Sequence, residues 1–149
     1  MYSDPKVADF IARHFETVRA HVKDNAELYR QLGQRFSAQW TPTVLVVDSS
    51  GHERHRIEGF LPPDDFLAQL KLGLAHSAFA GGRFAEAEPL FKEIADQHPE
   101  TDAAPEAQYW TGVSRYKATN DASALHATFE KFRKQYKDST WAKKASVWG

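Results

Sequence analysis

The sequence predicts a small α/β unit followed by an array of α-helices. Residues 1–62 mix extended and helical patterns, whereas every apolar pattern from Pro63 onward has helical spacing. The helical part also repeats itself with a period of 37 to 38 residues. With 149 residues, 42% of them hydrophobic, the chain is long enough for one ordinary domain or for two small units that share a core.

The α/β part is expected to run helix, strand, helix, β-hairpin and helix. The Ser-Asp-Pro sequence at positions 3–5 caps a first helix, because apolar residues at helical spacing follow it. Polar and apolar residues then alternate over Thr17–Val22, which predicts a half-buried strand. Asp24 and Asn25 cap the second predicted helix.

The hairpin has the strongest strand pattern in the chain. Thr43–Val47 is an apolar, β-branched run, and such runs favour strands. It ends in the turn sequence Asp48–Gly51, and Arg56–Phe60 is expected to be the returning strand.

The helical part contains five apolar stripes, which begin at Leu67, Ala87, Tyr109, Leu125 and Trp141. Its repeat matches small residues with small ones and aromatic residues with aromatic ones. The pairs at a spacing of 37 residues are Ala75 and Gly112, Phe79 and Tyr116, and Ala87 and Ala124. A period of this size with two helices per unit is typical of a helical solenoid.

This helical part resembles the tetratricopeptide repeat. The residues of the first copy that carry the resemblance are Leu74, Ala75, Gly82, Phe84, Ala87, Phe91 and Pro99. The second copy keeps Gly112, Tyr116 and Ala124, but it has Thr111 and Arg115 where the pattern prefers apolar residues. The resemblance implies that the array is the main surface for polypeptide recognition.

The front part resembles the later part of a thioredoxin fold. The residues that carry this resemblance are Trp40–Thr43, the strand that runs to Asp48, the turn at Gly51, and Gly59 with Phe60. In thioredoxin-like proteins this Thr-Pro-Thr sequence comes just before a hairpin strand and its proline is cis. The resemblance therefore implies a cis Thr41–Pro42 bond. Both parts together look like thioredoxin-family proteins with a C-terminal tetratricopeptide array.

The departure from that family concerns its chemistry. In the family a strand and a helix with Cys-x-x-Cys precede the segment that begins here at Tyr2, and this chain has no cysteine. Dithiol activity therefore cannot be carried over. The expected architecture is a truncated thioredoxin-like unit over residues 1–80 and a tetratricopeptide-like array over residues 63–149, with the helix 63–80 shared. No linker-like stretch separates the two parts, so one continuous core is expected.

In the family the absent strand lies between the strands that match Thr17–Val22 and Thr43–Asp48, so a vacant place in the sheet is expected. Either the first of these strands slides into the vacancy, or two chains pair across it as a homodimer. Val18, Ala20 and Val22 form an apolar edge that only Arg19 and His21 interrupt. This edge favours the dimer.

The candidate binding residues are Thr41, Pro42, Tyr109, Trp110 and Arg115. In the thioredoxin family the residue before the cis proline, here Thr41, offers its backbone to an extended substrate; alternatively, the proline only shapes the start of the hairpin.

Tyr109 and Trp110 are adjacent on a predicted helix, so they are expected to point to different faces, one of them exposed. Most other aromatic residues of the array are expected to be core. Basic residues are enriched in the last third, either as a solvated face or for an acidic peptide partner.

Other chemistry finds no support in the sequence. His52 and His55 are close in sequence, but no third metal ligand is evident, and Asp64 and Asp65 are expected to begin a helix. We therefore expect no catalytic residue, no metal and no cofactor. The formal net charge is -1 without a basic block, which argues against a nucleic-acid partner. No membrane span or signal peptide is predicted, and a cytoplasmic location is expected.

The expected function is a non-catalytic scaffold or binding module for a protein or peptide. The alternative is a shortened form of a thiol–disulfide oxidoreductase whose Cys-x-x-Cys lies upstream. A third class is a purely structural oligomer.

Overall fold

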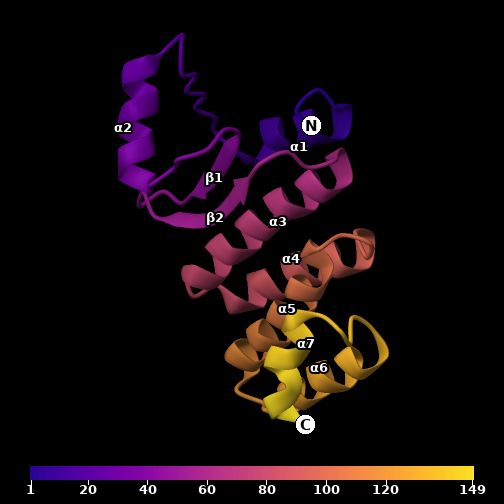
Figure 1. The fold of residues 1–149 in the computed structure, drawn as a ribbon. Helices are drawn as coiled ribbons and strands as arrows, with labels where there is room; N and C mark the ends of the chain where they lie inside the picture. The colour runs from indigo at the N-terminus through magenta and orange to yellow at the C-terminus, as the bar shows by residue number, and fades with distance from the viewer.

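The computed structural model describes residues 1–149, which form seven α-helices, a short 3-10 helix and a two-stranded antiparallel sheet. The elements in chain order are α1 (Pro5–His14), α2 (Ala26–Phe36), β1 (Thr43–Val47), β2 (Glu53–Glu58), α3 (Pro63–Ala80), α4 (Phe84–Gln97), α5 (Ala103–Thr119), α6 (Ser123–Lys134), α7 (Thr140–Ala145) and η1 (Ser146–Trp148). The hairpin and the first three helices form one end of the molecule, and α4 to α7 extend from them in chain order towards the C-terminus (Figure 1). The predicted α/β unit with a helical array is therefore confirmed.

Helix α1 begins where the sequence predicts. The Asp4 carboxylate accepts hydrogen bonds from the backbone N–H groups of Lys6 at 2.9 Å and Val7 at 3.3 Å, and Pro5 occupies the first turn. These contacts satisfy N–H groups that have no partner within the helix.

The predicted strand over Thr17–Val22 is wrong. Residues 15–21 have no regular secondary structure, and the connection climbs away from the hairpin to the far end of α2 (Figure 1). The Asn25 side chain accepts from the backbone of His21 and donates to the carbonyl of Arg19 at 3.0 Å. These local bonds compete with a sheet ladder. No strand lies beside the segment to pair with it, so Val18 and Val22 are 75% and 52% exposed.

The hairpin pairs β1 with β2 in an antiparallel register in which Val44 faces Ile57. A bulge interrupts this register between Val46 and Val47. The sheet contains these two strands alone, so one edge of β1 has no partner strand. The unpaired edge of β1 lies where a vacant place was expected, but the strand predicted on the other side of that place does not form.

Helix α2 stands apart from the core. None of its residues is buried, although its pattern is strongly amphipathic. Polar contacts join it to the hairpin: the Arg56 guanidinium donates to the carbonyl oxygen of Phe36, and Arg35 Nη2 donates to that of Gly51 at 3.4 Å.

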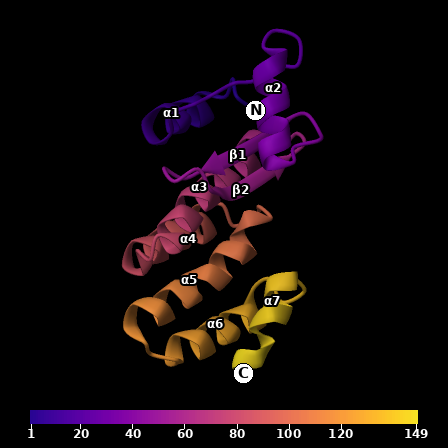
Figure 2. The same cartoon turned by 90° about the vertical axis from the view of Figure 1, so that its left-hand side faces the viewer.

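Helix α3 contributes to two hydrophobic cores. Phe66 and Leu70 pack with α1 and the hairpin in a core that is completed by Val7, Val46 and Ile57. Leu72 and Ala75 pack into the core of the array, which also contains Phe91 and Ile94 of α4 and Ala107 of α5. Both cores thus meet in one continuous helix, and the helices beyond it stack in successive layers (Figure 2).

Two glycines permit the closest approaches between elements. A Cβ placed on Gly73 of α3 would lie 2.5 Å from Cγ2 of Val46 in β1. A Cβ placed on Gly112 of α5 would lie 1.8 Å from Oγ1 of Thr128 in α6. Neither position has room for a side chain, so both packing arrangements depend on glycine.

None of the helices combines the length with the apolar character that crossing a bilayer requires.

Candidate binding site

The Thr-Pro-Thr segment joins α2 to β1. Its Thr41–Pro42 peptide bond is cis, which is the configuration that the thioredoxin resemblance implies. The carbonyl of Pro42 accepts from the N–H of Gly59 at 2.8 Å, and Thr43 Oγ1 donates to the carbonyl of Trp40 at 2.7 Å. Thr41 itself is exposed, and its backbone amide and carbonyl have no partner. The segment therefore holds Thr41 in place while its backbone can bind an extended chain.

Two large aromatic side chains lie close to this segment, one next to it in sequence and the other beside the residue that hydrogen-bonds to it. Trp40 precedes Thr41 and is 68% exposed, and Phe60 follows Gly59 and is 70% exposed. Because the Gly59 N–H bonds to Pro42, both aromatic residues belong to the same end of the hairpin. Exposed aromatic residues at this density are more typical of an interaction site than of a solvated loop.

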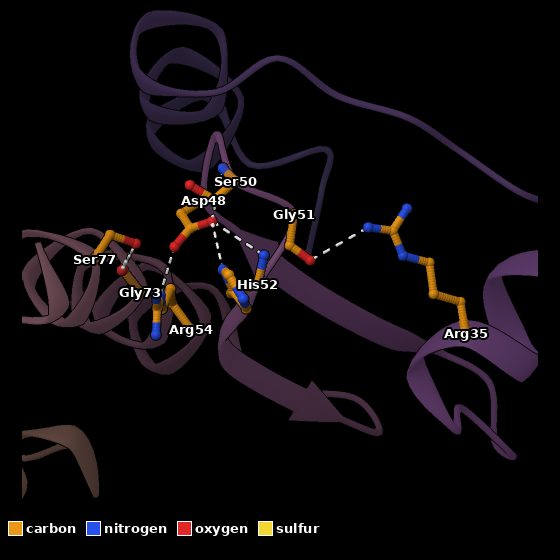
Figure 3. A network of polar contacts seen from close by, with 8 residues as sticks. All are labelled: Arg35, Asp48, Ser50, Gly51, His52, Arg54, Gly73 and Ser77. Atoms are coloured by element: carbon orange, nitrogen blue, oxygen red, sulfur yellow. Dashed lines mark hydrogen bonds and ion pairs between the residues drawn. The ribbon is translucent and has the colours of Figure 1, made fainter.

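The opposite end of the hairpin is held by Asp48 (Figure 3). One carboxylate oxygen accepts from the N–H groups of Ser50 at 2.9 Å and His52 at 3.0 Å, and the other accepts from Arg54 Nε at 2.6 Å. The backbone bond from His52 contributes most to lowering the pKa of Asp48, and Arg54 and Ser50 act in the same direction. This network is structural, because it closes the turn between β1 and β2.

The second candidate site lies on the array. Trp110 of α5 lies in a cluster of aromatic rings. Its ring centroid lies 5.1 Å from that of Phe79 and 5.5 Å from that of His76, both in α3, and 5.4 Å from that of Tyr109 in α5. Its indole N–H is buried without a hydrogen-bond partner. Trp110 therefore packs against α3, and its indole N–H is a hydrogen-bond donor without an acceptor.

Tyr109 contacts the C-terminal helices. Its ring stacks on Trp148 at 4.8 Å and lies 5.2 Å from Trp141, on which Lys144 rests with its ammonium 4.0 Å from the ring centroid. Burial raises the pKa of Tyr109. Tyr109 and Trp110 are both partly buried and contact each other, so the expectation that they would separate into a buried and an exposed residue is not met.

A chain of polar contacts connects the hairpin to the array beside this aromatic cluster. His55 of β2 donates to Gln69 at 2.6 Å, and its ring stacks at 5.9 Å on His76, which bonds to Glu106 of α5 at 3.2 Å. Burial, more than any other cause, lowers the pKa of His55. His55 therefore lies between Gln69 and His76, whereas the side chain of His52 is exposed at the turn. The structure brings no three His, Cys, Asp or Glu side chains together as metal ligands.

Arg115 is exposed and lies apart from the aromatic cluster. It lines a groove between α4, α5 and α6, together with Gln108 and Lys131. The structure thus divides the predicted residues among three places: Thr41 and Pro42 at the hairpin, Tyr109 and Trp110 between the helices, and Arg115 in the groove. Sequence reasoning missed this groove; its one visible signal was the pair of small residues Gly112 and Ala124, which let helices approach closely.

The charges of the chain are strongly divided along its length. Residues 1–110 contain 11 basic and 17 acidic side chains, whereas residues 111–149 contain eight basic and three acidic ones. The two parts thus carry formal net charges of −6 and +5, which cancel almost completely in the whole chain. The second helical repeat is the basic end of the molecule.

The fold and these surfaces define a small α/β unit that shares a helix with a solenoid of paired helices. Known families match the same two parts: a thioredoxin-like domain matches residues 2–73, and the tetratricopeptide repeat matches residues 67–101 and 106–139. The matches overlap within α3. No curated protein and no solved structure matches the chain.

The chain consists of a thioredoxin-like domain followed by tetratricopeptide repeats. These two domains indicate a protein-interaction scaffold.

Proposed function

We propose that the protein is a non-catalytic scaffold that binds a polypeptide through the aromatic surface formed by α3, α5 and α7. The observation that carries this proposal is the set of partly buried rings that joins these helices, which consists of Phe79, Tyr109, Trp110, Trp141 and Trp148. Trp110 adds a buried N–H without a partner, which a bound carbonyl group would satisfy. Tryptophan and tyrosine are the residues that most often anchor protein interfaces.

The hairpin offers a second contact to the same partner. The free backbone of Thr41 and the exposed rings of Trp40 and Phe60 suit an extended chain, which would bind by backbone hydrogen bonds and side-chain pockets. Binding at both places would increase the overall affinity beyond that of either place alone.

The experiment that tests the proposal measures affinity for a peptide selected by display on the whole protein. Tyr109→Ala removes an anchor and is expected to weaken binding by at least about fivefold, because the few anchoring residues of an interface each contribute more than about 1 kcal/mol. Trp110→Phe keeps an aromatic ring in the cluster but removes the free N–H, and it is expected to weaken binding too. Isothermal titration calorimetry gives the affinities, and circular dichroism gives the fold.

Trp40→Ala tests the second contact, in the thioredoxin-like domain. It is expected to reduce the affinity less than Tyr109→Ala does. If Tyr109→Ala and Trp110→Phe bind like wild type while Trp40→Ala does not, the peptide binds at the hairpin and the aromatic surface of the array is only packing.

We also propose that two copies of the chain pair through the open edge of the sheet. The support is the edge of β1, which has no partner strand. A second observation is the exposure of the apolar side chains of Val18 and Val22 in the connection after α1. Free backbone groups along such an edge readily pair with another chain. Equivalent edges in two copies would pair about a two-fold axis.

Light scattering coupled to size exclusion is expected to show twice the chain mass of 16.9 kDa. Val18→Lys and Val22→Pro are expected to shift the equilibrium towards monomer, because they replace exposed apolar side chains of the connection that the dimer is expected to cover. Val147→Lys, at a position 79% exposed near the C-terminus, is the control and should leave the dimer intact. A monomer mass for wild type over a roughly hundredfold range of concentration would refute the dimer.

A further inference from the structure

A groove of about 280 Å³ lies on the array between α4, α5 and α6. Gly112 lets the side chain of Thr128 in α6 pack directly against the backbone of α5, and both residues line the groove. Small residues of the two helices, among them Thr111, Ala124 and Ala127, line it further. Both Tyr109 and Trp110 lie outside its lining, so the groove is separate from the aromatic surface.

A polar group of the groove is buried without a partner. Gln108 of α5 lines the groove and is only 8% exposed, yet its side-chain Nε2 has no hydrogen-bond partner. A buried amide donor left unpaired costs free energy that an acceptor in the groove would recover. Gln108 lies one helical turn from Gly112 towards the N-terminus of α5, and α6 runs back along α5, so Lys131 lies at the same end of the groove.

Three basic side chains, Lys92, Arg115 and Lys131, line the groove together with three acidic ones, Glu88, Asp96 and Asp121. Arg115 and Lys131 are exposed and take part in no ion pair. The carboxylates are largely engaged: Asp96 pairs with Lys92 at 2.5 Å, and Asp121 accepts from the N–H of Ser123 at 2.9 Å.

The Ser123 N–H lowers the pKa of Asp121 most, and Arg115 lowers it further. Glu88 is the one acidic side chain of the groove that no such contact engages. The excess positive charge of residues 111–149 adds to the attraction for an anionic ligand.

We propose that this groove binds an acidic, extended segment of a polypeptide. Lys131 binds a carboxylate at one end, where Gln108 Nε2 donates to a neighbouring carbonyl group, and Arg115 binds a carboxylate at the other end. The small floor residues leave room for a main chain, but not for a bulky ring. This proposal rests on the proposed function of the protein as a polypeptide scaffold. It adds to that function a second binding surface, whose ligand is acidic.

The probe is a fluorescein-labelled peptide of alternating Glu and Ala, twelve residues long by design, measured by fluorescence anisotropy with the full chain. Lys131→Glu and Arg115→Glu are each expected to weaken its binding at least about tenfold, because each reverses a charge that faces a carboxylate. Gln108→Leu keeps the side-chain volume and is expected to weaken binding about threefold or more, because it removes the donor. In ¹H–¹⁵N spectra, the side-chain amide signal that is missing in Gln108→Leu should shift when the peptide is added to wild type.

Lys144→Glu is the matched control, because Lys144 lies on Trp141 of α7 rather than in the groove. It should change the affinity by less than about twofold, since the ligand lies away from it and salt screens distant charges. An equal loss with Lys144→Glu, or equal binding of a single-stranded oligonucleotide, would show general attraction of anions and overturn the proposal. No binding of the Glu–Ala peptide by wild type would overturn it as well.

The test also separates this site from the aromatic surface. Tyr109→Ala should leave binding of the Glu–Ala peptide unchanged, whereas it weakens the displayed peptide. If Tyr109→Ala weakens both peptides equally, there is one site on the array and the groove is not it.

Discussion

Gly73→Ala is expected to lower the free energy of unfolding by about 2 kcal/mol or more. The added methyl group would lie 2.5 to 2.9 Å from three carbon atoms of Val46. Overpacking of a core at this severity costs about 3 kcal/mol, and the higher helix propensity of alanine returns about 1 kcal/mol. Urea unfolding followed by circular dichroism measures the change.

Gly81→Ala is the control for this substitution at the end of the same helix. Its nearest neighbours would be the flexible tip of Arg83 and the carbonyl of Ser77, and its φ of -78° is ordinary for alanine. A change below about 0.5 kcal/mol is expected there. Val46→Ala should partly rescue Gly73→Ala, so that the double variant loses less than the sum of both single variants. Strict additivity of the two would contradict a direct contact.

Phe91→Ala is expected to lower the free energy of unfolding by about 4 kcal/mol. The side chain is fully buried in the core of the array and packs against His76 at 5.0 Å between ring centroids. Loss of a buried phenylalanine removes its transfer free energy and leaves a cavity, which together cost about 3 to 5 kcal/mol. Because α3 contributes to both cores, the whole chain is expected to unfold in one transition.

Tryptophan fluorescence and far-ultraviolet circular dichroism should give the same midpoint for this variant. Three of the four tryptophans, Trp110, Trp141 and Trp148, report on the array, whereas the dichroism reports on the whole chain. Phe60→Ala removes a ring that is 70% exposed and serves as the control, with a change below about 0.5 kcal/mol. Separate transitions in Phe91→Ala would mean that the thioredoxin-like domain folds independently of the repeats.

Local patterns predict most of the elements correctly. The capping sequence at Asp4, the β-branched run Thr43–Val47 and the helical stripes from Pro63 onward match the observed elements, because each depends on residues near one another in sequence. The strand over Thr17–Val22 was predicted wrongly for the opposite reason. A strand is stable only when another strand pairs with it, and a single alternating pattern does not reveal whether that partner is present.

The candidate binding residues were predicted less well than the fold. Tyr109 and Trp110 were expected on different faces, but α5 is covered on several sides at once, so both rings are partly buried. The groove could not be predicted, because it depends on how three helices cross rather than on any one of them. Arg115 was named from its charge alone, and its neighbours Gln108 and Lys131 became visible only with the helices in place.

Because α3 is one continuous helix that contributes to both cores, its length and its rotation about its own axis fix the orientation of the repeats relative to the hairpin. Each residue of an α-helix advances about 1.5 Å and turns about 100°. Deleting one residue between Leu70 and Leu72 would rotate Tyr109 and the groove by roughly a quarter turn or more about this axis relative to Thr41. A ligand that bridges the hairpin and the array would then face the wrong side. Both cores would also be disturbed, because Ala68 of the array core lies before the deletion and Gly73, which meets Val46, lies after it. Insertions or deletions in this helix therefore preserve the relative orientation of the two domains only when they are close to whole turns, about three or four residues at a time.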